Sequence, residues 1–250
     1  MNEIRMVVGD LDDTILNSQK QISPEMKRMR RLLRGRGIIF AVATARSVAS
    51  SARYIAELEP DYIISCDGGL ISSAERNLFV NSITEKQFAG LFKSIKDSDE
   101  IGKISIVGVN KDYSNYKGET LPDCFEREII KVICEVLTEN KKDALRKENE
   151  ELLVSCYHGQ AWIRFSNRQA TKYCALEQLC RYVHISTDQI LAFGDDYNDM
   201  EMLAGCGVGV AVENAVSSVK EVSNYITDDN DSDGVALFIK RYFGFEGGAL

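Results

Sequence analysis

Five short, almost entirely apolar runs limit the fold of this 250-residue chain more than any other feature. They lie at residues 5–9, 38–43, 62–64, 190–193 and 208–212. A near-continuous apolar run indicates a strand that is buried on both faces, as in a parallel sheet covered by helices. Helix-forming segments separate the runs, so we expect right-handed crossovers and a doubly wound, Rossmann-like α/β fold.

The segments between these runs carry helix signals. Ser23 can cap a helix whose first residue is Pro24, and this basic helix is expected to run to about Arg34. Further helices are expected at 47–58, 171–182 and 235–242.

The pattern changes in the middle of the chain. There we expect a helix at 84–96, a strand at 104–109, a helix from Pro122 to about Glu139, a charged link at 141–151 and a β-hairpin at 152–165. These features predict an α+β domain inserted into the α/β core. The expected division is 1–82 and 167–250 for the core and 83–166 for the insertion.

Acidic side chains cluster directly after two of the apolar runs. They are Asp10, Asp12 and Asp13 after the first run, and Asp195, Asp196 and Asp199 after the run at 190–193. Doubly wound sheets bind ligands at the carboxyl ends of their strands. If the two strands are neighbours, the acids face one crevice and form an oxygen-rich Mg²⁺ site. Taken singly, Asp195 or Asp196 could instead cap a following helix, but that alternative does not easily explain two clusters at two strand ends.

Two further features could hold a phosphate. Thr44 and Arg46 follow the run at 38–43 and offer a hydroxyl, backbone N–H groups and a cation. Lys172 lies in the first turn of its expected helix, where the helix dipole disfavours a cation, so it is either solvated or faces an anion. Taken singly, each feature is more typical of a structural role.

The composition excludes several classes of function. Lys and Arg total 30 against 38 Asp and Glu, a formal net charge of −8. This balance disfavours sequence-independent binding to nucleic acid and docking on an anionic membrane. No run approaches the ~18 apolar residues of a membrane span or the ~7–15 of a signal-peptide core. The seven cysteines lack paired spacing, so we expect reduced thiols and a cytoplasmic protein.

Four motifs, in order along the chain, resemble those of the haloacid dehalogenase-like hydrolase superfamily. They are DLDDT at 10–14, TAR at 44–46, Lys172 within KYCALEQL, and GDDYND at 194–199. Within the superfamily the chain resembles the Cof-type phosphatases, whose C2-type cap domain is inserted after the third core strand. The resemblance covers essentially all of the core, whereas the inserted domain corresponds in position and size only.

The resemblance implies a Mg²⁺-dependent phosphatase that acts on a small phosphomonoester, such as a sugar phosphate or a related metabolite. Asp10 would be the nucleophile that forms an aspartyl-phosphate, and Asp12 the general acid and then the base. Mg²⁺ would be held by the Asp10 carboxylate, the Asp12 backbone carbonyl and Asp195, with Asp199 supporting it through water.

The resemblance also assigns the groups that meet the substrate. Thr44, Lys172 and Asn198 would hold the phosphoryl oxygens. Three more residues are candidates for substrate contact or for supporting these groups: Arg46, Asp67 and Asp196. Candidates for specificity in the inserted domain are Tyr113, Asn115, Tyr116, His158 and Trp162.

Four positions depart from the family pattern. Asp13, Ala45 and Tyr173 stand where the family commonly has Gly, and Asp67 lies in CDGG where Asn-Gly is frequent. None of these departures removes a catalytic group, so they bear on the choice of substrate.

Two alternatives to hydrolysis stay open. One is a sugar phosphotransferase or mutase that uses the same aspartyl-phosphate. The other is a non-catalytic, receiver-like domain switched by phosphorylation, which also uses acids, a Thr and a Lys around Mg²⁺. The chain length and the acid two residues after the nucleophile disfavour the second. The sequence leaves the particular substrate and the oligomeric state open.

Overall fold

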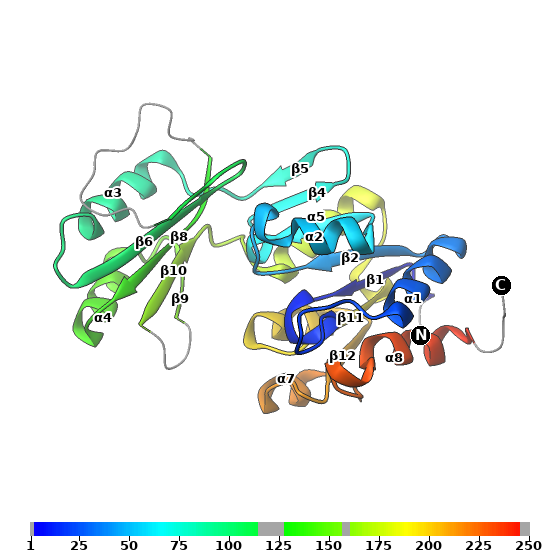
Figure 1. The fold of residues 1–250 in the computed structure, drawn as a ribbon. Helices are drawn as coiled ribbons and strands as arrows, with labels where there is room; N and C mark the ends of the chain where they lie inside the picture. The colour runs from blue at the N-terminus through cyan, green and yellow to red at the C-terminus, as the bar shows by residue number, and fades with distance from the viewer. Residues whose placement is uncertain (1–2, 115–127, 157–160, 246–250) are drawn as a thin grey trace.

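The computed structural model describes residues 3–114, 128–156 and 161–245, which form two lobes with one sheet each (Figure 1). The larger sheet contains, in spatial order, β13 (Tyr225–Thr227), β12 (Val208–Val212), β11 (Ile190–Gly194), β1 (Met6–Gly9), β2 (Ile39–Ala43), β3 (Tyr62–Ser65), β4 (Leu70–Ser73) and β5 (Asn77–Val80). We call this lobe the core.

The expected parallel sheet is confirmed. β1 lies between β11 and β2, and all three run parallel, with Gly9 opposite both Phe193 and Val42. Each of the five predicted strands belongs to this sheet. β13 and the antiparallel hairpin of β4 and β5 were not predicted, because their short sequences, YIT, LISS and NLFV, mix polar with apolar residues.

Two groups of helices cover the core sheet. The helices are α1 (Pro24–Gly35), α2 (Val48–Leu58), α5 (Lys172–Val183), α6 (Met200–Gly205), α7 (Ser217–Val222) and α8 (Gly234–Phe243). Packing contacts join α1 to α2 and α8, and join α6 to α5 and α7. The Ser23 side chain caps α1 by accepting a hydrogen bond from the N–H of Met26 at 3.0 Å, as expected.

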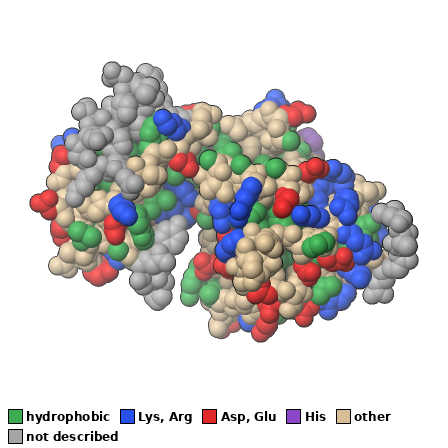
Figure 2. Space-filling model, viewed as in Figure 1, with side chains coloured by type: hydrophobic (Ala, Val, Ile, Leu, Met, Phe, Trp, Pro, Cys, Tyr) green, Lys and Arg blue, Asp and Glu red, His purple; other side chains and the backbone are tan. Residues whose placement is uncertain are grey.

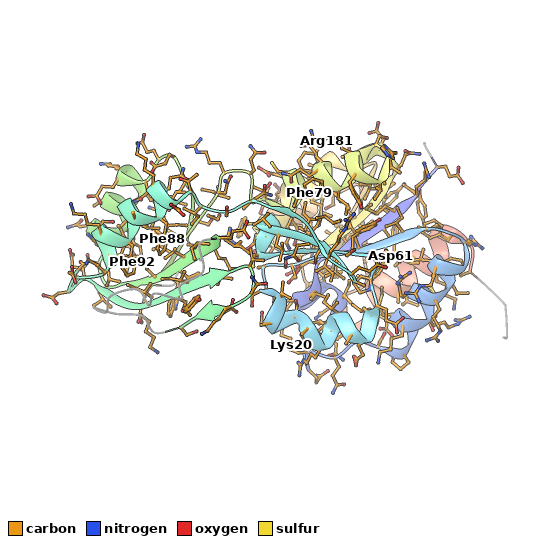
Figure 3. The ribbon with its side chains drawn as sticks, turned by 90° about the horizontal axis from the view of Figure 1, so that it is seen from above. Lys20, Asp61, Phe79, Phe88, Phe92 and Arg181 are labelled. Carbon is orange, nitrogen blue, oxygen red and sulfur yellow. The ribbon has the colours of Figure 1, made fainter. Side chains whose placement is uncertain are left out.

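The smaller lobe, which we call the cap, contains an antiparallel sheet and two helices. Its sheet order is β7 (Asp112–Tyr113), β6 (Ile101–Gly108), β8 (Ile129–Val136), β10 (Trp162–Ser166) and β9 (Leu153–Cys156), and its helices are α3 (Glu85–Ile95) and α4 (Glu139–Glu148). Phe88 and Phe92 of α3 stack with their ring centroids 5.6 Å apart and help to fill the core of this lobe (Figure 3).

Two elements of the cap differ from those predicted from the sequence. In place of a helix from Pro122 to Glu139, residues 129–136 form β8, and residues 122–127 lie outside the described part of the chain. This segment is rich in β-branched side chains, which favour a strand that can pair on both sides. In place of a charged link at 141–151, α4 begins after Thr138, whose hydroxyl accepts from the N–H of Lys141.

Other expectations for this lobe hold. The helix at 84–96 and the strand at 104–109 are present as α3 and β6, and β9 pairs with β10 in an antiparallel manner. The turn of that hairpin, residues 157–160, lies outside the described residues. The division of the chain after residues 82 and 166 stays a prediction.

The two lobes meet through polar and apolar contacts beside a notch visible in Figure 2. The Ser47 hydroxyl of the core donates to Asp112 of the cap at 2.6 Å, and Lys131 Nζ of β8 donates to the Ala45 carbonyl at 2.7 Å. A small hydrophobic cluster joins the lobes: Cys66, Leu70, Val107, Val109 and Ile130. The open face of the cap sheet is thereby held against the core near the carboxyl ends of β2 and β3.

Candidate active site

The first acidic cluster forms a tight turn at the end of β1. Asp10 follows the strand directly, and its N–H donates to the Phe193 carbonyl of β11 at 3.1 Å. Asp13 adopts a left-handed conformation, with φ of 58°. That conformation favours Gly and tolerates Asp better than most other residues. The turn therefore accepts the departure from the family pattern at this position.

The structure brings the two acidic clusters together. Carboxylate oxygens of Asp10, Asp195 and Asp199 all lie within 4.8 Å of one another. They meet because β1 and β11 are parallel neighbours whose carboxyl ends share one edge of the sheet. Asp199 is fully buried and Asp10 nearly so, so these acids form a site rather than a solvated surface patch.

Lys172 is the cation of this site. Its Nζ lies 2.8 Å from Asp10 Oδ1 and 2.7 Å from Asp199 Oδ1. Burial disfavours its charged form, but the two carboxylates outweigh burial and raise the pKa of Lys172. Of the two alternatives for a lysine at a helix start, the structure shows the one in which it faces anions.

The carboxylates outnumber the cation. Burial raises the pKa of Asp10 well above its usual range, and the charges of Asp199 and Asp195 raise it further. Burial also raises the pKa of Asp195 to about 7. The site is therefore short of positive charge. A hard divalent cation would supply that charge, and an all-oxygen donor set fits Mg²⁺.

Hydrogen bonds fix the orientation of these acids. Asp199 Oδ2 accepts the N–H groups of Asp195 and Asp196 at 3.1 and 3.2 Å. The buried hydroxyl of Thr14 donates to Asp195 Oδ1 at 2.6 Å. Thr14 was not among the predicted site residues, although its place in the first motif was an available signal.

Asp12 lies apart from this group and is held by basic side chains. Arg46 Nε and Nη2 each donate to one Asp12 oxygen at 2.7 Å, and Lys20 Nζ lies 3.3 Å away. Burial opposes the ionised form of Asp12, but the hydrogen bonds and charge of Arg46 outweigh it and lower the pKa. Thr44 is buried at the same edge, where its Oγ1 accepts the N–H of Arg46 at 3.1 Å.

Asp67 connects the core site to the cap. It is 2% exposed and accepts a hydrogen bond from Asn198 Nδ2 at 2.7 Å on one oxygen. Its other oxygen accepts from Arg164 Nη1 and lies 3.9 Å from Lys131 Nζ. Neither Arg164 nor Lys131 was predicted as a site residue. Their only signal was a lone cation inside an apolar strand.

The remaining candidates are less central. Asp196 is exposed and accepts from the N–H of Tyr197 at 2.8 Å, so it caps a turn and lies outside the carboxylate cluster. Tyr113 packs against the hydrophobic core of the cap, and Trp162 lies on β10. Asn115, Tyr116 and His158 lie outside the described residues.

The fold and site define an α/β enzyme with a carboxylate cluster at its strand ends, and comparison with known proteins identifies the family. A family model described as haloacid dehalogenase-like hydrolase matches residues 7–126 and 115–239. These ranges cover most of the chain, so the protein belongs to this family. The resemblance inferred from the four motifs is therefore confirmed.

Relatives cover nearly the whole chain. 5-Amino-6-(5-phospho-D-ribitylamino)uracil phosphatase YitU of Bacillus subtilis (strain 168) is 25% identical, over 95% of this chain and 97% of its own. The phosphatase of the same name YbjI of Escherichia coli (strain K12) is 24% identical, over 97% of each chain. These names confirm the expectation of a haloacid dehalogenase-like phosphatase.

Solved structures confirm the fold. A haloacid dehalogenase-like hydrolase from Bacteroides thetaiotaomicron has a TM-score of 0.82 at 22% identity, covering 96% of this chain and 100% of that chain.

The six cysteines within the described residues are free thiols. None of the helices in residues 3–114, 128–156 and 161–245 is long and apolar enough to cross a membrane.

Proposed function

We propose that the protein is a Mg²⁺-dependent phosphatase that hydrolyses small phosphomonoesters through an aspartyl-phosphate on Asp10. The observation that supports this most strongly is the buried group of Asp10, Asp195, Asp199 and Lys172 at the carboxyl ends of β1 and β11. Sugar phosphates or related metabolites are the proposed substrate class. The relatives named for a phosphorylated ribitylaminouracil support it.

The groups that would hold Mg²⁺ are the Asp10 carboxylate, the Asp12 backbone carbonyl and the Asp195 carboxylate, with Asp199 in support. When bound, the ion neutralises negative charge on the phosphoryl oxygens and on the acids around it. Thr14 and the backbone N–H groups of the loop after β11 keep Asp195 and Asp199 oriented for this task.

In the first step, an oxygen of Asp10 attacks phosphorus while the bond between phosphorus and the leaving oxygen breaks. Lys172 is protonated and lies 2.8 Å from Asp10, so it reduces the repulsion between the carboxylate and the anionic phosphate. The Thr44 hydroxyl and the Asn198 amide hold the other phosphoryl oxygens.

Asp12 moves the protons. As general acid it gives a proton to the leaving oxygen, and as base it then takes one from the water that hydrolyses the aspartyl-phosphate. Arg46 and Lys20 lower its pKa in the free enzyme. An incoming phosphate competes for these two cations. Asp12 is then free to take up the proton that it later gives to the leaving oxygen.

The test is the release of inorganic phosphate from p-nitrophenyl phosphate and a panel of sugar phosphates with Mg²⁺ present. Asp10→Asn should lower kcat/KM by about 10³-fold or more. Asp196→Asn, at an exposed acid of the second cluster, should stay within about 3-fold of wild type. A folded Asp10→Asn variant that is as fast as wild type would refute the proposal.

The products separate the two alternatives. An isomerised sugar phosphate would indicate a phosphotransferase, and a stable phosphoprotein without turnover would indicate a receiver-like domain.

A further inference from the structure

Three polar side chains share the face of the cap sheet that is turned toward the core. Ser166 of β10 lies directly opposite Lys131 of β8. Arg164 precedes Ser166 by two residues, so its side chain points to the same face. The neighbouring residues Val132 and Phe165 point to the other face, where they belong to the hydrophobic core of the cap.

This polar face lies beside the proposed phosphate site. Lys131 Nζ reaches the carbonyl of Ala45, which lies between Thr44 and Arg46 in the loop after β2. Arg164 and Lys131 both pair with Asp67, and Asp67 also binds the amide of Asn198. The two cations therefore lie on the cap side of the proposed phosphate site, where the leaving group of a bound phosphomonoester would extend.

The charges of this group do not balance. The side chains of Lys131 and Arg164 are 5% and 9% exposed, and Asp67 is the carboxylate that they share. A buried cation without its own counter-ion is costly because desolvation is not repaid by an ion pair. The group would gain stability from one more anion.

Hydrogen-bonding capacity is also unused here. Arg164 donates through Nη1 to Asp67 and through Nη2 to Ser155 Oγ at 3.1 Å. Its buried Nε and the buried Oγ of Ser166 have no hydrogen-bond partner within the described residues. Buried polar atoms are normally satisfied, so each unpaired one calls for an explanation. Both of these atoms belong to the same face of β10.

We propose that Lys131, Arg164 and Ser166 form a subsite for a second anionic group, a carboxylate or a second phosphate, on the leaving alcohol of the substrate. This inference rests on the proposed phosphatase function. A guanidinium recognises such planar or multi-oxygen anions through paired N–H donors. Asp67 is the positioning residue that holds both cations beside the proposed phosphate site before the substrate arrives.

The test compares substrates that differ in this group alone. 2-Phosphoglycolate carries a carboxylate where ethyl phosphate carries a methyl group, and propane-1,3-diol bisphosphate carries a second phosphate where propyl phosphate carries none. Wild type should prefer an anionic member by about 10-fold or more in kcat/KM. A larger preference in the first pair would identify the anion as a carboxylate, and a larger preference in the second pair would identify it as a phosphate.

Substitutions in the cap locate the preference. Arg164→Gln should lower kcat/KM for the preferred anionic substrate by about 10–100-fold and for its neutral partner by less than about 3-fold. Ser166→Ala should also lower kcat/KM selectively for the anionic substrate, but by a smaller factor. Arg146→Gln, which removes an arginine whose side chain is 46% exposed on α4, is the control and should change neither value.

A binding measurement separates this inference from the proposed function. In an Asp10→Asn background, calorimetry should show that the preferred anionic compound binds about 10-fold more tightly than its neutral partner, and Arg164→Gln should abolish the difference. The subsite would be overturned if the enzyme hydrolyses the neutral substrates but binds both members of each pair with equal affinity. It would also be overturned if Arg164→Gln lowers kcat/KM equally for both members of a pair. Arg164 would then be only a contact between the lobes. Selective binding without any turnover would overturn the phosphatase proposal and leave the subsite intact.

Discussion

The core and the cap place their charged groups in different ways. In the core, Asp10 and Asp195 follow the ends of two neighbouring parallel strands, so strand pairing alone brings them together. In the cap, Lys131 and Arg164 lie within strands, and they meet because both point to one face of an antiparallel sheet. A site at strand ends is visible in the sequence as acids after an apolar run, whereas a site on a sheet face is visible only once the register is known.

The largest expected effect is at the buried cation of the core. Lys172→Met leaves Asp10 and Asp199 without the ammonium group that both contact. We expect kcat/KM for p-nitrophenyl phosphate to fall by about 10²–10³-fold, because charge stabilisation at the phosphoryl group is lost. Lys220→Met is the control, since this lysine pairs only with Glu213 among the ion pairs of the described residues. Equal activity of both variants would mean that Lys172 has only a structural role.

At the contact between the lobes, the substitution that removes the carboxylate shared by two cations is Asp67→Asn. It leaves Lys131 and Arg164 buried without their carboxylate. We expect the free energy of unfolding, measured with urea at pH 7, to fall by about 3 kcal/mol. Asp143→Asn, whose side chain is 62% exposed, should change it by less than about 0.5 kcal/mol.

The pH dependence of this effect has a defined sign. Burial opposes the ionised form of Asp67, but Arg164 and Lys131 outweigh burial and lower its pKa in the folded state. Its stabilising contribution is therefore complete above the unfolded pKa of about 3.9 and is lost as the pH falls through the folded pKa. The stability difference between wild type and Asp67→Asn should shrink in acid. A difference that is constant with pH would contradict this assignment.

Most of the core could be predicted from the sequence. Apolar runs such as Ile190–Phe193 are typical of buried strands, and the acids after them share one edge of the sheet because the strands are parallel neighbours. The pairing of Asp12 with Arg46 could not be predicted, because it depends on the distance between the loops after β1 and β2. The sequence left a capping role open for Asp196, and in the structure Asp196 caps a turn by accepting the N–H of Tyr197.

The cap was less predictable for a physical reason. In β8, Lys131 and Glu135 lie four residues apart among β-branched residues, so its pattern resembles an amphipathic helix as much as a strand. Pairing with β6 and β10 decides between the two. Asp67, Lys131 and Arg164 lie far apart in the chain, so their contact depends on how the lobes are joined.

Metal binding in the core should depend on pH. Burial raises the pKa of Asp195 to about 7, and Mg²⁺ requires the ionised carboxylate. Lowering the pH from 8 to 6 protonates this group and should weaken the apparent Mg²⁺ affinity about 10-fold in calorimetry. Thr14→Val removes the hydroxyl that lowers this pKa, so the transition should move to higher pH. Affinity that does not change over this range would exclude Asp195 as a ligand that titrates there.

The smallest expected effects are at two helix caps, one in a helix that was predicted from the sequence and one in a helix that was not. Ser23 caps α1 in the core, and Thr138 caps α4 in the cap, each by accepting a backbone N–H. Replacing either residue by Ala should lower the free energy of unfolding by about 1 kcal/mol. Urea titration followed by circular dichroism would measure both. If Thr138→Ala has no effect while Ser23→Ala has its full effect, the start of α4 is not stabilised in this way.

The central claim is that Asp10 carries the phosphoryl group during turnover. The direct measurement is a single turnover with Mg²⁺ and p-nitrophenyl phosphate, quenched in acid and followed by mass spectrometry of the digested protein. We expect one phosphoryl group on the peptide that contains Asp10, removed by hydroxylamine as an acyl phosphate and absent in Asp10→Asn. Phosphate on another peptide, or rapid product release with no phosphoenzyme at any quench time, would contradict the account.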